Sequence, residues 1–443
     1  MLTSYDVAIA GGGPAGAFTA HELARAGLSI LLIDPAVTRP RLEGLGERVA
    51  HLLEKRGLHE ALAAAGRPVR RSIAWAGLQE PSNGERLVRR HDFDAALRRA
   101  AVEAGAIFLQ ARVSRVESAG LGDGVSVKLS SGETVTARLL VDARGRQAPS
   151  ATRLKGPQTL AISALLTTPP QTEETHVEAA PQGWMWSAQD PDFGHWLQIC
   201  VDPDGLKGAG QEALAERMHR FLSQPRFKDR FPDTSFQGPL FARHAGLVLA
   251  APKLDGPVIP VGDAAVAIDP LSGHGLFWAL SSALSAVPSV LSILDGPETG
   301  YDLATRFFHD RVVATFWRQA RVGRDFYRLE KDLAGEPFWE QRAVWPDDTP
   351  AHTTEDGVRM DRRVVVDNNR LKERDILVTP EHPDGIAFIA GVPVSDLTGF
   401  LRAPVPTDEA TTHPSPAFAA ALQWLESRGL LHDIKPTKTR ETA

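Results

Sequence analysis

The 443-residue chain contains very little cysteine, with Cys200 as its single example. One cysteine cannot form an intramolecular disulfide or supply a cysteine cluster for a metal, so no metal site is predicted. The sequence also lacks a basic excess, because its formal net charge is −6 at pH 7. That balance gives no electrostatic reason to expect nucleic acid or an anionic membrane as a partner.

Targeting features are also missing. The N-terminus enters an apolar strand directly, without the basic region, apolar core and cleavage site of a signal peptide. We also expect no apolar run long enough to cross a membrane. Together with the cysteine usage, these absences predict a cytoplasmic protein. Its length predicts two or three domains.

The most informative stretch is DVAIAGGGPAG, residues 6–16. An apolar strand leads into Gly11-x-Gly13-x-x-Gly16, and a stretch with helical spacing follows. Gly11 permits a tight turn, Gly13 lets a pyrophosphate approach the backbone, and Gly16 lets the helix pack close to the sheet. The anion would lie at the helix N-terminus, where N–H groups and the dipole favour negative charge. We therefore predict contacts to a dinucleotide from Gly11, Gly13, Pro14, Ala15 and Gly16.

An acidic residue completes this fingerprint. A second predicted strand, Ser29–Ile33, ends at Asp34, which lies about 20 residues beyond the glycines and can accept hydrogen bonds from a ribose. The glycines between strand and helix, followed by this acid, favour a nucleotide site over a glycine-rich turn without a ligand.

Changes in the pattern of apolar residues along the chain predict that one domain is built from two separate segments. Residues 1–157 and 251–345 alternate strand and helix patterns and form the dinucleotide-binding domain. Residues 158–250 carry short alternating apolar runs between Pro and Gly clusters, which predicts an inserted, largely antiparallel β-sheet. Residues 346–436 are expected to form a small C-terminal α+β domain, and residues 437–443 a disordered tail.

The order of these features resembles the glutathione-reductase-type flavoproteins of the aromatic hydroxylase, halogenase and geranylgeranyl-reductase superfamily. The resemblance covers roughly residues 1–340 and implies an α/β fold with a Rossmann-like FAD-binding domain. In combination its motifs are specific for FAD. They are Gly11-x-Gly13-x-x-Gly16, Arg90-x-x-Phe93-Asp94, Val141-Asp142-Ala143-x-Gly145, and Gly262-Asp263-Ala264-Ala265 leading to Pro270-Leu271-x-Gly273-x-Gly275.

This resemblance assigns roles to the later motifs. It implies that Gly262 and Asp263 hold the ribityl chain, and that the loop from Gly273 to Leu276 lies along the isoalloxazine ring. Asp34 departs from the glutamate that is more usual in these proteins but keeps the acceptor. Arg48 reaches a phosphate or a flavin edge, or else is an ordinary solvated charge. The other expected FAD contacts are Arg90, Val113, Asp142, Pro270 and Gly275.

A narrower resemblance concerns the substrate. Gly183-Trp184-Met185-Trp186-Ser187-Ala188, Phe326–Glu330 and Pro337-Phe338-Trp339 resemble flavoproteins that mature tryptophylquinone cofactors in amine dehydrogenases and amino-acid oxidases. Residues 383–388, PDGIAF, look most like the member that acts on quinohemoprotein amine dehydrogenase. The resemblance implies an FAD-dependent monooxygenase that hydroxylates a tryptophan of the small subunit before the quinone forms. The expected partner is therefore a polypeptide.

The reductant is left open by the sequence. Only one dinucleotide fingerprint is present, and FAD is expected to occupy it; Gly208-Ala209-Gly210 follows no convincing strand. NAD(P)H would therefore bind transiently, or reduced flavin would come from elsewhere.

Two polar residues are candidates for catalysis. His274 is expected near the flavin, where it would stabilise a flavin anion or take a proton from the hydroxylated ring. A loop histidine bonded to backbone is an equal alternative. Glu47 faces the same cavity, or is simply a carboxylate in the first turn of a helix, which is the plainer interpretation.

Three tryptophans, Trp184, Trp186 and Trp196, fall on the predicted sheet. Trp184 and Trp186 share one face if their segment is a strand. They line an aromatic substrate pocket in one interpretation and pack in the core in the other.

Three rival functions share much of this pattern. Trp184-Met185-Trp186 has the W-x-W half of the halogenase signature, but Ala188-Gln189 stands in place of its Ile-Pro half, and Ser72–Trp75 lacks a lysine. A small-molecule aromatic hydroxylase would have the same flavin half, although it gives the C-terminal domain no obvious task. A non-catalytic flavoprotein chaperone is the third possibility.

Overall fold

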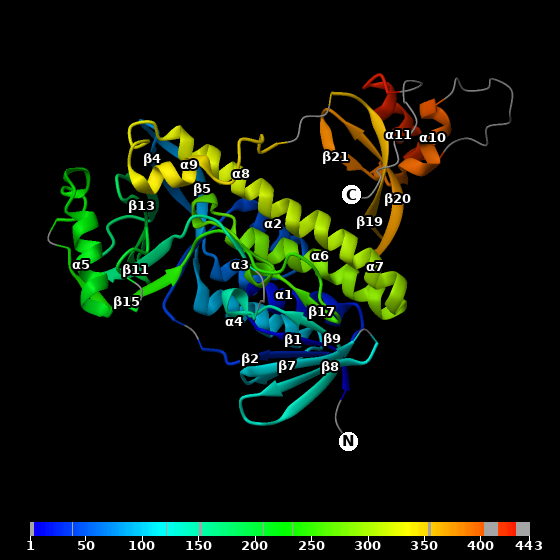
Figure 1. Cartoon of the computed structure of the whole chain (residues 1–443), viewed down its shortest axis with the longest axis horizontal. Coiled ribbons are helices and arrows are strands. Elements are labelled where there is room, and N and C mark those ends of the chain that lie inside the picture. The colour runs from blue at the N-terminus through cyan, green and yellow to red at the C-terminus, as the bar shows by residue number, and fades with distance from the viewer. Residues whose placement is uncertain are drawn as a thin grey trace. The chain divides into compact units, whose positions relative to one another are not determined.

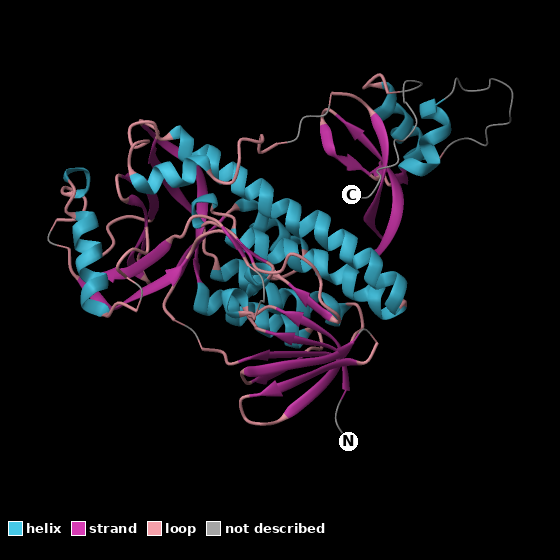
Figure 2. Ribbon diagram, viewed as in Figure 1, coloured by secondary structure: helices cyan, strands magenta, loops and turns pink. Residues whose placement is uncertain are grey.

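The computed structural model describes residues 4–37, 39–120, 122–149, 153–206, 208–232, 234–352, 356–402 and 415–430. The chain divides into two compact units. The first consists of Met1–Val290 and Phe308–Ala351, and the second of Leu291–Phe307 and His352–Ala443. Figure 1 labels their elements and Figure 2 separates helices from strands. The expected tail at residues 437–443 lies outside the described residues.

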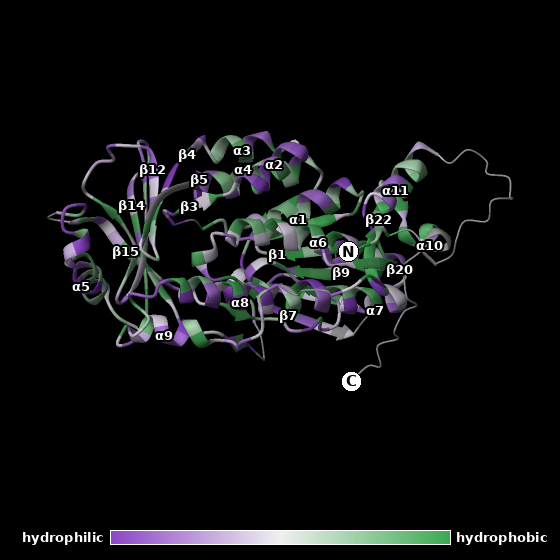
Figure 3. Ribbon diagram, turned by 90° about the horizontal axis from the view of Figure 1, so that it is seen from above, coloured by the Kyte–Doolittle hydropathy of each residue, from purple (hydrophilic) through white to green (hydrophobic). Residues whose placement is uncertain are grey.

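A seven-stranded sheet in the first unit carries the nucleotide fingerprint. Its order is β6-β2-β1-β9-β8-β7, with β17 also paired to β9. The strands β6, β2, β1, β9 and β17 run parallel. Figure 3 shows that β1 and β9 are mainly hydrophobic, as expected for strands covered on both faces. The strand bounds are β1 (Ser4–Ala10), β2 (Ile30–Asp34), β6 (Ile107–Gln110), β7 (Val113–Gly120), β8 (Gly124–Leu129), β9 (Thr134–Asp142) and β17 (Val258–Pro260).

The register of this sheet gathers three loops at one edge. Ala10 pairs with Asp142, and Asp142 pairs with Pro260, so β1, β9 and β17 end at the same level. Helix α1 (Pro14–Arg25) follows β1 and packs against α4 (Arg90–Glu103). In open α/β sheets this carboxyl edge is where ligands bind. The α/β fold with a Rossmann-type FAD-binding domain is confirmed.

An eight-stranded sheet, here called the platform, also belongs to this unit. Its order is β15-β11-β14-β13-β12-β4-β5-β3, and its pairs are antiparallel except for β4 with β12. The sequence predicts the strands within residues 158–250 but not β3, β4 and β5. The platform strands are β3 (Leu42–Leu45), β4 (Pro68–Trp75), β5 (Leu78–Arg89), β11 (Leu160–Leu166), β12 (Glu174–Ala180), β13 (Gly183–Asp190), β14 (Gly194–Val201) and β15 (Phe236–His244).

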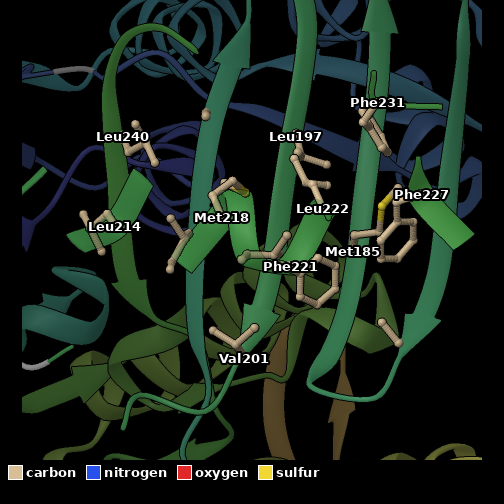
Figure 4. Packing of buried hydrophobic residues seen from close by; sticks show 14 of the residues in the cluster. Met185, Leu197, Val201, Leu214, Met218, Phe221, Leu222, Phe227, Phe231 and Leu240 are labelled. Carbon is tan, nitrogen blue, oxygen red and sulfur yellow. The ribbon is translucent and has the colours of Figure 1, made fainter. Parts of the chain in front are cut away.

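One face of the platform is closed by α5 (Gln211–Leu222). Figure 4 shows Met218 and Phe221 of this helix lying on Met185 and Leu197 of the strands, within one buried apolar cluster. Because side chains alternate along a strand, the neighbouring residues Trp184, Trp186 and Trp196 point to the opposite face. The α5 face therefore forms a core, and the other face is available to the flavin site.

The remaining helices and short strands complete the first unit. They are α2 (Glu47–Lys55), α3 (His59–Ala64), α8 (Ala314–Leu329) and α9 (Pro337–Val344), together with a three-stranded sheet of β10 (Leu154–Lys155), β16 (Val248–Leu249) and β18 (Val266–Ala267). A π-helical turn at His309–Val313 joins α7 (Pro297–Phe308) to α8.

The expectation that no apolar run is long enough to cross a membrane is wrong. Helix α6 (Gly275–Asp295) is long and apolar enough to cross a bilayer by length and composition alone. Within the structure, 72% of its most apolar window is buried, as in the core helix of a folded domain. This single helix is weak evidence for a membrane span.

The second unit combines the end of α6 with α7 (Pro297–Phe308) and the C-terminal strands. Ser292 Oγ accepts a hydrogen bond of 2.8 Å from Leu371 N, and Arg306 pairs with Glu373 at 2.7 Å. Its elements include β19 (Arg359–Asp367), β20 (Arg370–Thr379), β21 (His382–Ile386), β22 (Phe388–Ile389), β23 (Val392–Pro393), α10 (Val394–Arg402) and α11 (Pro416–Glu426). The domain boundaries predicted from the sequence, at residues 157/158, 250/251 and 345/346, stay predictions.

Phe221→Ala tests the core beneath the platform. Phe221 is fully buried and its ring lies 5.3 Å from that of Phe227, so truncation leaves a cavity. We expect the free energy of unfolding, measured by urea denaturation, to fall by about 3–5 kcal/mol. The neighbouring Arg220→Ala, which removes an exposed ion pair with Glu216, should cost at most about 0.5 kcal/mol. Equal losses in the two variants would contradict this packing.

Candidate flavin site

The three glycines of the fingerprint have different surroundings. Gly11 has φ +107°, and a Cβ there would lie 2.4 Å from Ala143 O. A Cβ on Gly16 would lie 1.8 Å from Gly11 O, whereas one on Gly13 would meet nothing within 4 Å. Gly11 and Gly16 are therefore required by packing, and Gly13 borders open space.

That open space lies at the N-terminus of α1. Gly13 is the N-cap residue in an extended conformation, no side chain caps the helix, and Pro14 occupies the first turn. The N–H groups of the first helical turn are therefore the donors available to an anion there. This backbone cradle fits the pyrophosphate of FAD.

Asp34 is oriented by the loop that it faces. Its Oδ2 accepts a hydrogen bond of 2.6 Å from Gly12 N, and its Oδ1 accepts one of 2.7 Å from Ala36 N. Each carboxylate oxygen has a further lone pair, so ribose hydroxyls still find acceptors. Arg98 Nη1 donates to Gly12 O at 3.2 Å, a contact that sequence reasoning did not include.

The other two loops of the carboxyl edge carry acids of unequal availability. Asp142 is buried and accepts hydrogen bonds of 3.0 and 2.7 Å from Arg144. The side chain of Asp263 is 41% exposed and lies 3.4 Å from Arg146. Gly262, at φ +56°, donates to Ser282 Oγ at 2.8 Å. Asp263 is therefore the acid that is open to a ribityl chain.

The predicted isoalloxazine loop is built to leave room beside its backbone. Asp269 Oδ1 accepts from Leu271 N at 2.9 Å and so caps a 3₁₀ turn over Pro270–Ser272. A Cβ added at Gly273 or at Gly275 would meet nothing within 4 Å. Leu276 is buried in the first turn of α6. The loop thus combines a fixed backbone with open space, which fits a planar ring.

His274 projects from this loop with an exposed side chain. Partial burial, followed by the nearby Arg48 and Arg71 guanidiniums, lowers the pKa of His274. The neutral imidazole is therefore favoured at pH 7, where it can accept a proton.

Arg90 belongs to a network of charges. It forms two 2.9 Å hydrogen bonds with Asp94 and one of 3.0 Å with Glu43. Burial opposes ionisation of Glu43, but Arg41, Arg90 and Arg243 outweigh it and lower the pKa of Glu43 to about 2. Protein carboxylates therefore already balance the charge of Arg90. Sequence reasoning missed Glu43, whose strand it did not predict.

Two other predicted residues, Glu47 and Val113, contact protein groups outside the loops described above. Glu47 opens α2 as a mainly exposed carboxylate, 3.6 Å from Arg86 Nε. Val113 begins β7 and packs against an apolar cluster beside β1 and β2.

The platform tryptophans share a face but differ in exposure. Trp184 and Trp196 are 2% and 3% exposed, so each is packed within an apolar cluster. Trp186 is only partly buried and donates from Nε1 to Glu85 Oε1 at 3.3 Å. Of the three, Trp186 is the one that a ligand could contact.

The aromatic cluster around Trp184 also reaches the flavin loop. Its rings include Trp75, Tyr327 and Trp339, and Leu271 of the loop packs against it. We call this cluster the aromatic wall, and the flavin loop packs against it through Leu271. Among the described residues no group of three or more His, Cys, Asp or Glu side chains could hold a metal.

Comparisons with known proteins agree with this geometry. The family model described as lycopene cyclase protein matches residues 6–165, which include the glycine fingerprint. The tryptophan 2-halogenase of Chondromyces crocatus is 28% identical over 74% of this chain and 69% of its own length. The flavin-dependent halogenase CmlS shares the fold at TM-score 0.73, covering 97% of this chain and 93% of CmlS, at 16% identity.

Fold and site together define an FAD-dependent oxidoreductase of the monooxygenase and halogenase class. A solved structure narrows this class. The peptidyl tryptophan dihydroxylase QhpG, described as essential for tryptophylquinone cofactor biogenesis, is 34% identical with TM-score 0.83, covering 97% of this chain and 100% of QhpG. The chain belongs to the family of FAD-dependent monooxygenases that includes QhpG.

Gly13→Val tests the pyrophosphate cradle. A branched side chain would occupy the space in front of α1 without striking protein atoms, so the protein should fold and lose most of its bound FAD. FAD per protein is measured from the visible absorbance of the purified protein.

Gly335→Val is the matched control, because a Cβ at Gly335 also meets nothing within 4 Å but lies in the loop between α8 and α9. It should retain wild-type FAD. Full FAD occupancy in Gly13→Val would show that the pyrophosphate lies elsewhere.

Proposed function

We propose that this protein hydroxylates a tryptophan side chain of a polypeptide during biogenesis of a protein-derived tryptophylquinone cofactor, using O₂ and reduced FAD. The observation that carries the proposal is the similarity to QhpG, which extends over nearly the whole of both chains. The substrate that we propose is the small subunit of an amine dehydrogenase before its quinone has formed.

The site supports this chemistry at three points. Bound FAD would supply the activated oxygen, and the protein supplies position, dryness and electrostatics. The aromatic wall around Trp184 gives the flavin loop an apolar neighbour, because Leu271 packs against it. His274 is the nearby base whose neutral form is favoured, and it takes the proton released when the hydroxylated indole regains aromaticity.

The source of electrons for the flavin is part of the proposal. The one glycine fingerprint provides the FAD cradle, so we propose that NAD(P)H binds only transiently to deliver its hydride. A separate source of reduced flavin is the competing route.

Halogenation is the second candidate function, since the tryptophan 2-halogenase matches 74% of the chain. Against it, Ala188 and Gln189 replace the Ile-Pro half of the halogenase signature, and the strand segment Ser72–Trp75 carries no lysine. A small-molecule aromatic hydroxylase would use the same flavin loops.

The direct test is mass spectrometry of the small subunit, isolated before quinone formation, after incubation with the purified protein, NADH and ¹⁶O₂ or ¹⁸O₂. We expect a gain of roughly 16 or 32 mass units on one tryptophan with ¹⁶O₂, and a correspondingly heavier product with ¹⁸O₂. Added bromide or chloride should leave these masses unchanged.

Each competing function gives a different result in this assay. Halide incorporation indicates a halogenase, and NADH consumption only with added phenols or indoles indicates a small-molecule hydroxylase. Binding of the subunit without NADH oxidation or a mass gain indicates a chaperone. Any of these outcomes contradicts the proposed hydroxylation.

His274→Ala tests the proposed base. Loss of a general base lowers a rate by about 10²-fold or more, so kcat for hydroxylation should fall at least that far while FAD remains bound. His91→Ala, which changes an exposed histidine on α4, is the control and should keep wild-type kcat. A kcat within twofold of wild type in His274→Ala would remove this residue from the mechanism.

A further inference from the structure

A small cavity adjoins the flavin loop within the first unit. Its volume is about 30 Å³, and its lining includes Asp269, Gln319, Tyr327 and Arg342. Asp269 immediately precedes Pro270, the first residue of the turn that leads to Gly273. The cavity therefore reaches the loop from the side of α8 and α9.

Two polar atoms of this lining have no hydrogen-bond partner among the described residues. They are Gln319 Oε1 and Arg342 Nε, and both are buried. The guanidinium of Arg342 is otherwise fixed, because it donates to Phe338 O at 2.7 Å, Gln158 O at 2.6 Å and Asp202 Oδ1 at 3.0 Å.

These atoms match the requirements of bound water. A buried water needs about 10–15 Å³ and two to four polar partners. A water in the cavity would accept from Arg342 Nε–H and donate to Gln319 Oε1, and so would complete two buried polar groups of the kind that are normally satisfied. The site thus has room and partners for one or two waters.

Asp269 is the group in the cavity lining that can take up a proton. Its Oδ2 accepts a 3.4 Å hydrogen bond from the Tyr327 hydroxyl, while its Oδ1 is held by Leu271 N. Burial raises the pKa of Asp269, and the Leu271 N–H, Arg342, Arg146 and the Tyr327 hydroxyl partly offset that rise. The guanidinium of Arg324 also lines the cavity, and the buried thiol of Cys200 interacts electrostatically with Asp269.

We propose that Asp269 and the water held by Gln319 and Arg342 form a proton-uptake site that is coupled to reduction of FAD at the adjoining loop. The inference rests on the FAD binding of the proposed function. Two electrons pass from the reductant to the flavin, and the added negative charge favours protonation of a nearby carboxylate. One proton then moves from solvent through the cavity water to Asp269, so the O–H bond formed on the carboxylate is matched by an O–H bond broken in the water.

The test is the pH dependence of the two-electron midpoint potential of the bound flavin, measured between about pH 5 and pH 9. One extra proton per two electrons steepens the potential by about 30 mV per pH unit. We expect this steeper region in the wild-type protein and its loss in Asp269→Asn. Asp348→Asn, which changes a fully exposed carboxylate, is the control and should keep the wild-type profile.

Two further variants test the Tyr327 hydroxyl and the cavity water separately. Tyr327→Phe removes the hydroxyl donor from the Asp269 carboxylate, and Gln319→Leu removes the acceptor of the cavity water. Loss of the Tyr327 donor makes the charged carboxylate less favourable, so the steep region should extend to higher pH in Tyr327→Phe. In Gln319→Leu the leucine displaces the cavity water, which is the other donor to the carboxylate, so the profile should move in the same direction. They also carry the test if Asp269→Asn fails to fold.

The outcomes distinguish this inference from the proposed function. Equal slopes of potential against pH in wild type and Asp269→Asn, at full FAD occupancy, overturn proton uptake by Asp269. That result leaves the proposed function untouched. Unchanged profiles in Tyr327→Phe and Gln319→Leu overturn the coupling through the hydroxyl and the water. A purified protein that binds no FAD overturns the proposed function and this inference together.

Discussion

The structure depends on the parallel register of β1, β9 and β17. Because Ala10, Asp142 and Pro260 are level, the loops that follow these strands open at the same edge. Residues far apart in the sequence, such as Gly13 and Asp263, are thereby brought to one nucleotide site. Hydrogen bonding between strands, rather than side-chain contact, sets this geometry.

The platform adds a second constraint, because successive side chains along its strands point to opposite faces. Met185 and Leu197 pack toward α5, and Trp184 and Trp186 point to the flavin side. The aromatic wall therefore cannot be moved without disturbing the core beneath it. Leu271 rests on this wall, and so the position of the flavin loop depends on packing in both sheets.

The sequence predicts the nucleotide half well because glycine spacing and strand endings carry geometric requirements. Gly11 and Gly16 are crowded by Ala143 and by the Gly11 carbonyl, and only a residue without a side chain fits at either position. Asp34 likewise follows from its place at the end of β2. These features depend on local sequence.

The platform was predicted only in part, for a physical reason. Strand β4 reads PVRRSIAW, and the adjacent Arg70 and Arg71 interrupt its apolar alternation; Arg70 is exposed, and Arg71 lies 3.7 Å from Glu85. Tertiary contacts bring Arg90 to Glu43, Gln198 to Arg243 and the Tyr327 hydroxyl to Asp269. The burial of Trp184 and Trp196 depends on α9 and β15, which no local pattern reveals.

The parallel pairing of β4 with β12 also bears on how the chain reaches this structure. Arg70 aligns with Glu174, so the two partners are more than 100 residues apart in the chain. During synthesis the β4–β5 hairpin therefore presents an unpaired edge until β12 has emerged, and such edges invite pairing with other chains. Because contacts of long sequence separation form slowly, we expect the β4–β12 pairing to form after the local β4–β5 hairpin.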